Sequence, residues 1–151
     1  DGKKAVFLLS TGIDTLSKHT YGEALRKAET SDTMIYAISM GQLARLYMES
    51  RTAPEDNIAF LQADNVLRSL ADATGGKGFF PRFVGEYPSI YETVSASLRN
   101  QYSIGFIPKV RKTDGKLHKL RVEVPPLDVN KDGKPDKLKV LHKKGYYAPK
   151  S

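Results

Sequence analysis

Residues 128–136, with the sequence DVNKDGKPD, space their oxygen-bearing side chains as a calcium-binding loop does. Asp128, Asn130, Asp132 and Asp136 occupy positions 1, 3, 5 and 9, and a glycine at position 6 permits a sharp turn. The backbone carbonyl of Lys134, at position 7, completes the loop. We predict that these five residues bind Ca²⁺ in a structural role, because three carboxylates repel one another unless a cation lies between them.

Lys131, Lys134 and Lys137 weaken the negative electrostatic field of this loop. The twelfth position of the loop is Lys139, whereas an EF-hand has a glutamate there. The pattern DxNxDGxxD resembles the calcium loops of integrin-type propeller repeats and of dockerins, in which the aspartate at the ninth position serves as a calcium ligand. The alternative is a polar hairpin tip without a metal, because Asn, Asp, Gly and Pro all favour turns. Any calcium affinity is expected to be modest, roughly 10⁻⁴–10⁻³ M.

A second place for chemistry follows the apolar run at residues 5–9, which ends in Ser10, Thr11 and, three residues on, Asp14. Small and oxygen-bearing residues at the end of a buried strand are typical of the mouth of a ligand or metal site. Thr11 offers only a neutral hydroxyl, and Asp14 is expected to face out of the loop. The alternative is a turn whose polar groups are satisfied by its own side chains.

The sequence carries no constellation for catalysis. The chain has no cysteine, and His19, His118 and His142 lie far apart without an acid–base partner at a suitable spacing. The glycines of TGGKGFF follow a predicted helix and precede a predicted strand, which is the reverse of a phosphate-binding loop. We therefore expect a helix C-cap there, no enzyme activity, and no catalytic or cofactor-binding residues.

The first hundred residues alternate between strands and helices. Strand, helix and strand over the opening 40 residues predict a parallel crossover unit, and its first strand is expected to be covered on both faces. Residues 41–60 are less clear: QLARLYMES is compatible with a helical turn or two, RTAPEDN predicts a loop, and the stretch is interpreted as a mobile insertion. The expected strands are residues 5–9, 33–39 and 77–80. The first expected helix begins at a Thr20/Glu23 capping box, and two further helices are expected at residues 65–74 and 88–98.

The pattern changes after residue 100. Apolar residues alternate with other residues over 102–107 and 119–124, and a further strand is expected from Leu138 through Val140. The tetrapeptide TDGK predicts a hairpin turn in which Asp114 and Gly115 both adopt positive φ. The fold class is thus α/β, a parallel three-layer half-sheet followed by an antiparallel β extension.

Five stretches together resemble a known family. They are KKAVFLLSTGIDTLS, MIYAISM, LADATGGKGFF, SLRNQYSIGFIP and LKVLHKKGYYAP, in that order. They are similar to the second half of von Willebrand factor type A-like domains, and in particular to the bacterial, Acidobacteria-type VWFA-related group. The resemblance implies a Rossmann-like fold over residues 1–100, a β extension over 101–151, protein binding or adhesion as the function, and a secreted or cell-envelope location.

In that family a divalent cation sits at the carboxyl ends of the strands. The resemblance implies a DxSxS motif and a Ser/Thr-Asp-Gly segment as ligands, but the chain has no DxSxS and carries Ser10-Thr11-Gly12. Because a hard cation needs anionic oxygens, we expect a degenerate adhesion-type site at Ser10, Thr11 and Asp14, without Mg²⁺.

Composition and charge limit the partners. The chain has 151 residues, of which 40% are hydrophobic and 27% charged, with a net charge of +7. Residues 109–151 hold 13 Lys/Arg against 5 Asp/Glu, and residues 1–108 hold 11 against 12. One interpretation of this basic tail is that its lysines lie on the solvent face of strands. The alternative function is binding to nucleic acid or to an anionic surface.

No apolar run approaches the ~18 residues of a membrane span. The chain begins at Asp1 without a Met or a signal-peptide pattern, so we expect a piece of a longer protein. A half-sheet leaves an open edge, which predicts that a missing first half, the β tail or a second copy in a homodimer covers it.

Overall fold

The computed structural model describes residues 4–48, 54–136, 138 and 140–150. Three strands form a parallel sheet in the order β1-β2-β3, with β1 at Lys4–Ser10, β2 at Thr33–Ser39 and β3 at Lys77–Phe79. The register aligns Ser10 with Ser39, so β1 and β2 end side by side. This arrangement confirms the predicted parallel crossover.

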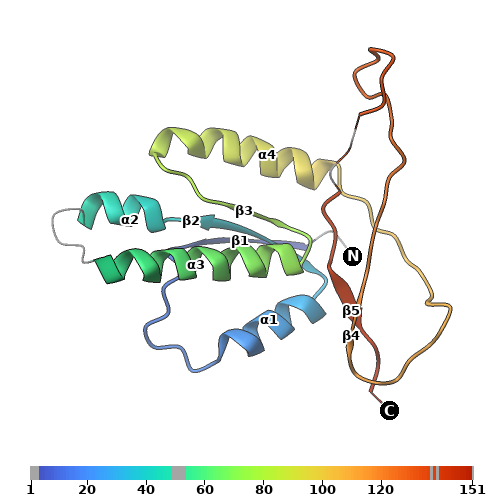
Figure 1. The fold of residues 1–151 in the computed structure, drawn as a ribbon, viewed down its shortest axis with the longest axis horizontal. Coiled ribbons are helices and arrows are strands. Elements are labelled where there is room, and N and C mark those ends of the chain that lie inside the picture. Colours follow the sequence, from blue (N-terminus) through green and yellow to red (C-terminus); the bar gives the residue numbers. More distant parts are fainter. Residues whose placement is uncertain (1–3, 49–53, 137, 139, 151) are drawn as a thin grey trace.

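The helices form where local signals place them (Figure 1). In α1, Tyr21–Thr30, the Thr20 hydroxyl accepts a hydrogen bond from the Glu23 amide, and the Glu23 carboxylate accepts one from the Thr20 amide. This is the predicted capping box. The other helices are α2 at Gly41–Met48, α3 at Pro54–Ala73 and α4 at Tyr87–Arg99, which follows a 3₁₀ turn at Val84–Glu86.

Helices cover both faces of the sheet. On one face, Tyr36 and Ile38 of β2 pack with Ile90 and Val94 of α4. On the other face, Ala37 of β2 packs with apolar residues of α3. The core is therefore centred on β2, whose last four residues are all buried.

The prediction that β1 is covered on both faces is wrong. Val6 is 47% exposed, Phe7 44% and Leu9 47%. An apolar run predicts that a strand is buried but not what lies over it. Because β1 is the edge strand, Ala5 and Leu8 pack against the core clusters of the two faces while its other apolar side chains stay nearly half exposed.

Where described, residues 41–60 are more regular than the predicted insertion, which was expected to hold one or two helical turns and a loop. Residues 41–48 form α2, and α3 begins at Pro54, eleven residues before the predicted start at Asn65. Proline is tolerated in the first helical turn because its missing N–H would lack an intrahelical partner there. Residues 51–53 of the predicted loop lie outside the described residues.

The end of α3 confirms the helix C-cap interpretation of the glycines. Gly76 donates its amide to the Ala71 carbonyl and Gly75 donates to Asp72, which is a Schellman arrangement. Gly75 has φ +77°, and a Cβ there would lie 2.7 Å from the carbonyl carbon of His142. The glycine is thus required both by the turn and by the close approach of the tail.

The β extension is less regular than predicted. In the described residues, β4, Leu117–Lys119, and β5, Gly145–Tyr147, form the one antiparallel strand pair. The predicted strands at 102–107 and 138–140 are not formed there, and of the predicted strand at 119–124 only Lys119 lies in a strand. The two arms between β4 and β5 are joined at Leu120 to Lys144 and at Asp136 to Leu127. Pro125 and Pro126 lack the N–H that a continuous ladder needs.

The predicted turn at TDGK is partly wrong. Gly115 has φ +64°, but Asp114 is not among the described residues with positive φ, and it bridges to Lys150 instead. The turn therefore leads into β4 beside the end of the chain and does not join two long strands.

The tail docks at the amino ends of the parallel strands, the end of the sheet opposite α2 (Figure 1). The Lys143 ammonium donates to the Ser31 carbonyl and lies 3.5 Å from the Asp32 carboxylate. The Tyr147 hydroxyl donates to Glu29 at 2.7 Å, and the Arg26 guanidinium lies over the Tyr147 ring.

Candidate functional site

The carboxyl ends of β1 and β2 bring two serines and the loops that follow them together. Ser10 and Ser39 are register partners, and the Met40 amide donates to the Ser10 carbonyl at 2.9 Å. Open parallel sheets bind ligands at this end of their strands. Ser10, Ser39 and the loops after them therefore lie at the edge where such sheets place ligand sites.

A buried polar pair supports this edge from below. The Ser39 hydroxyl, which is fully buried, donates to Asp64 Oδ1 at 2.5 Å and accepts from the Gly41 amide at 3.1 Å. Asp64 is 9% exposed. The pair ties the middle of α3 to the turn that starts α2, so it positions the loop between β2 and α2.

Sequence reasoning missed Asp64 because it started the helix at Asn65. A signal was present, since Phe60, Asp64, Leu67 and Ala71 follow the helical spacing of one buried face. A carboxylate within an inward-facing apolar stripe indicates a buried hydrogen-bond partner.

The residues of the predicted degenerate adhesion site make turn contacts. The Ser10 hydroxyl accepts from the Gly12 amide at 2.9 Å, and Asp14, which is exposed, accepts from the Ser17 amide at 3.0 Å. Thr11 is half-buried. The Ser10 and Asp14 side chains thus serve the loop after β1, and the degenerate adhesion-type metal site there stays a prediction.

The loops after all three parallel strands expose large apolar side chains. Ile13 and Leu16 follow β1, Met40 follows β2, and Phe83 and Val84 follow β3. Leu16 is 93% exposed and Phe83 61%. We call these five residues the apolar rim.

The 128–136 loop folds around its own carboxylates at the far tip of the β extension. Asp128 accepts from the Gly133 amide at 2.9 Å and from the Asp132 amide at 3.1 Å. Asp132 accepts from the Lys134 amide at 2.9 Å, and Asp136 accepts from the Val129 amide at 3.1 Å. Backbone amides thus satisfy part of the hydrogen-bonding capacity of each carboxylate, as expected for a polar hairpin tip without a metal.

Asn130 completes the set of side chains in this loop. Its carbonyl oxygen accepts from the Asp132 amide, and its amide nitrogen donates to Asp132 Oδ2 at 3.2 Å. Within the described ranges, no three His, Cys, Asp or Glu side chains gather as a metal-binding group. Calcium at Asp128, Asn130, Asp132, Lys134 and Asp136 therefore stays a prediction.

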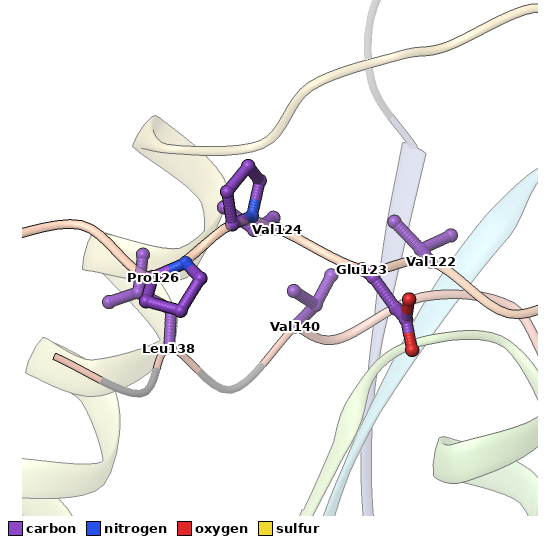
Figure 2. A pocket seen from close by; sticks show the side chains of 7 residues that line it. Val122, Glu123, Val124, Pro126, Leu138 and Val140 are labelled. Atoms are coloured by element: carbon purple, nitrogen blue, oxygen red, sulfur yellow. The ribbon is translucent and has the colours of Figure 1, made fainter. Parts of the chain in front are cut away.

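A shallow hollow of about 650 Å³ opens between the two arms of the β extension (Figure 2). Its only acidic lining residue, Glu123, forms an ion pair with Arg121. The hollow is lined by Val122, Glu123, Val124, Pro125, Pro126, Leu138 and Val140. Apart from Glu123, these described lining residues have apolar side chains.

The three histidines lie in separate surroundings, but His19 and His118 each have an acidic neighbour four residues away, which was not predicted from the sequence. His19 lies 3.7 Å from Glu23, His142 contacts the Lys143 carbonyl, and His118 contacts Asp114 at 3.1 Å. The Lys116 amide, and after it the His118 side chain, hold the pKa of Asp114 below its usual value. His118 of β4 stacks on the Tyr146 ring of β5, and this strand pair lies at the opposite end of the sheet from the loops of the apolar rim (Figure 1).

Comparisons with protein-family models, with curated proteins and with solved structures find no match to this chain. The family resemblance therefore stays a prediction. In the described part of the chain, no helix has the length and apolar character needed to cross a membrane.

Proposed function

We propose that the chain is a non-enzymatic protein-binding module of the von Willebrand factor A-like, adhesion type, from a secreted or cell-envelope protein, with a degenerate adhesion site and a structural calcium loop. The observation that carries the proposal is the apolar rim. The three loops that carry these exposed apolar side chains follow the same ends of neighbouring strands, and exposed apolar patches are typical of interaction surfaces. Their position at the carboxyl ends of parallel strands is where open α/β sheets recognise ligands.

The chemistry of the rim favours a protein over a nucleic acid. Ile13, Leu16, Met40, Phe83 and Val84 carry no charge, whereas nucleic-acid surfaces are basic. The basic excess lies in residues 109–151, which dock at the other end of the sheet. Rim and basic tail are therefore separate surfaces.

Substitutions in the rim test this function. The chain is immobilised and exposed to bacterial envelope extract, the retained protein is purified, and its binding is measured by calorimetry. Leu16→Glu and Phe83→Glu are expected to weaken binding by about tenfold or more, because each puts a charge into an apolar contact. Ile104→Glu is the matched control, since Ile104 is 78% exposed but lies in the β extension, outside the apolar rim.

Binding that Leu16→Glu and Phe83→Glu leave unchanged would contradict the proposal. The alternative function requires a different result, namely retention of DNA or anionic vesicles with an affinity that falls steeply as salt rises.

A further inference from the structure

The segment that joins α4 to β4 holds a dense run of exposed hydrophobic side chains. Large hydrophobic residues occupy five of the nine positions from 102 to 110, and four of them are at least 69% exposed. They are Tyr102, Ile104, Phe106, Ile107 and Val110. Figure 1 shows the segment as a loop that leaves the end of α4 and bulges away from the α/β body before it enters β4. We call residues 102–112 the apolar–basic loop.

Basic residues accompany the last of these side chains. Lys109, Arg111 and Lys112 lie within the loop, and residues 100–113 contain no acidic residue. All three basic residues are exposed, and none of them forms a salt bridge in the described part of the chain. The loop therefore presents apolar surface and positive charge side by side.

The base of the loop is fixed to the tail. The Phe106 ring packs edge-on against the Tyr146 ring of β5, with the ring centroids 5.6 Å apart, and His118 of β4 stacks on the same tyrosine. Because the tail docks at the amino ends of the parallel strands, the loop projects past that end of the sheet (Figure 1). The half-sheet predicted to precede β1 would extend the sheet sideways, beside β1, and not past this end.

The mixture of side chains fits a lipid bilayer better than a protein interior. A protein that covered Ile107 and Val110 would also take Lys109 between them out of water, and the loop has no acidic residue to compensate a buried cation. At a bilayer surface, apolar side chains enter the boundary of the hydrocarbon while lysine and arginine side chains extend to the phosphate groups.

The aliphatic character of the loop also favours lipid over nucleic acid. Proteins hold unpaired bases by stacking them on aromatic rings, to which Ile104, Ile107 and Val110 cannot contribute. The same three side chains gain free energy when they leave water for the acyl region of a membrane.

We propose that the apolar–basic loop binds the chain to the surface of an anionic lipid bilayer, with Ile104 and Ile107 inserted and with Lys109, Arg111 and Lys112 at the headgroup phosphates. Binding is peripheral and reversible, since one short loop buries far less apolar area than a spanning helix. The inference is independent of the apolar rim. The rim lies at the other end of the sheet, so a chain bound through this loop presents its rim away from the lipid.

Co-sedimentation with vesicles tests the loop. The chain is expected to bind vesicles of phosphatidylglycerol and phosphatidylcholine, and to bind vesicles of phosphatidylcholine alone more weakly. Ile107→Glu is expected to weaken binding by about tenfold or more, because it removes an inserted side chain and adds a charge that the headgroups repel. Leu16→Glu is the matched control, since Leu16 is 93% exposed in the rim, and it is expected to keep vesicle binding. Circular dichroism establishes that both variants fold.

The basic residues are tested separately. Lys109→Gln is expected to weaken binding to the phosphatidylglycerol vesicles by about fivefold, which is the contribution of one basic residue at an anionic membrane surface. Lys18→Gln is the matched control, because Lys18 is exposed but follows β1 at the other end of the sheet.

Tryptophan fluorescence gives a readout that does not depend on affinity. The chain has no tryptophan, so Ile104→Trp reports on a single position. Its emission is expected to shift to shorter wavelength when phosphatidylglycerol vesicles are added, because the indole ring moves from water into the bilayer interface. Leu16→Trp is expected to show no shift.

A folded chain that does not bind these vesicles, or whose binding Ile107→Glu leaves unchanged, would overturn the inference. Binding that survives Ile107→Glu but disappears as salt rises would assign it to the charge of the basic tail alone. Retention of DNA or of a soluble protein that Ile107→Glu abolishes, without vesicle binding, would assign the loop to that partner and exclude the bilayer. Because Leu16→Glu tests the rim and Ile107→Glu tests the loop, the failure of either proposal is seen separately.

Discussion

Asp64 and Ser39 show how a single carboxylate sets the shape of the candidate site. The Asp64 carboxylate accepts from the buried Ser39 hydroxyl, and that hydroxyl in turn accepts from the Gly41 amide. The turn between β2 and α2, which carries Met40 of the apolar rim, therefore depends on a polar pair inside the fold.

Removing the hydroxyl tests this role. Ser39→Ala is expected to lower the free energy of unfolding by about 1–3 kcal/mol, because it leaves a buried carboxylate without that donor. Urea denaturation measures the change. Ser89→Ala is the control, since the Ser89 hydroxyl is exposed and bonds within its own helix turn. A value for Ser39→Ala equal to that of Ser89→Ala would show that the pair does not support the turn.

At the scale of elements, the long hairpin of the β extension has few internal ties. Its arms are joined at Leu120 and at Asp136, and the loop beyond them is closed by backbone amides bonded to Asp128, Asp132 and Asp136. A cation among these carboxylates would offset their repulsion and hold the two arms at their tip.

Calcium titration followed by thermal melting tests that element. At about 10 mM Ca²⁺ the free energy of unfolding is expected to rise by about 1.4–2.7 kcal/mol, for a dissociation constant of roughly 10⁻⁴–10⁻³ M. Asp132→Asn is expected to abolish most of the rise, because the amide keeps an acceptor oxygen but loses the charge. Asp14→Asn, in an exposed turn, is expected to retain it. No rise with calcium, or an equal rise in Asp132→Asn, would favour the metal-free hairpin tip.

At the scale of the whole molecule, the basic tail is fastened to the α/β body through a small number of contacts. The Tyr147 hydroxyl donates to Glu29 of α1, and this hydrogen bond, followed by burial, raises the pKa of Tyr147. A phenol whose folded pKa is raised contributes stability that is complete below the unfolded value of about 10 and is lost as the pH rises through the folded pKa.

The Tyr147→Phe variant tests this fastening. At pH 7 it is expected to be less stable than the parent by about 1 kcal/mol, because the hydrogen bond to Glu29 is lost. The difference is expected to shrink between about pH 9 and 11, since only the parent loses this bond on deprotonation. Burial also raises the pKa of Tyr36, but Tyr36 is present in both proteins and cancels. Urea midpoints over this pH range measure the gap, and a constant gap would contradict the assignment.

Local signals in the sequence determined the elements that depend on interactions within a few residues. The Thr20/Glu23 capping box, the glycine end of α3 and the bounds of β2 were predictable, because each depends on hydrogen bonds, backbone conformation or apolar runs within a few residues. The calcium loop belongs to this level too, since the spacing of its oxygen ligands is local, and it stays a prediction.

Only the tertiary structure decided which patterns found a partner. Residues 102–107 alternate like a strand yet form none in the described chain, and the apolar β1 lies half exposed, because pairing and burial depend on what another segment supplies. Asp64 meets Ser39 across 25 residues for the same reason. Sequence spacing describes the groups that a segment offers, whereas contacts between distant segments determine which of them are satisfied.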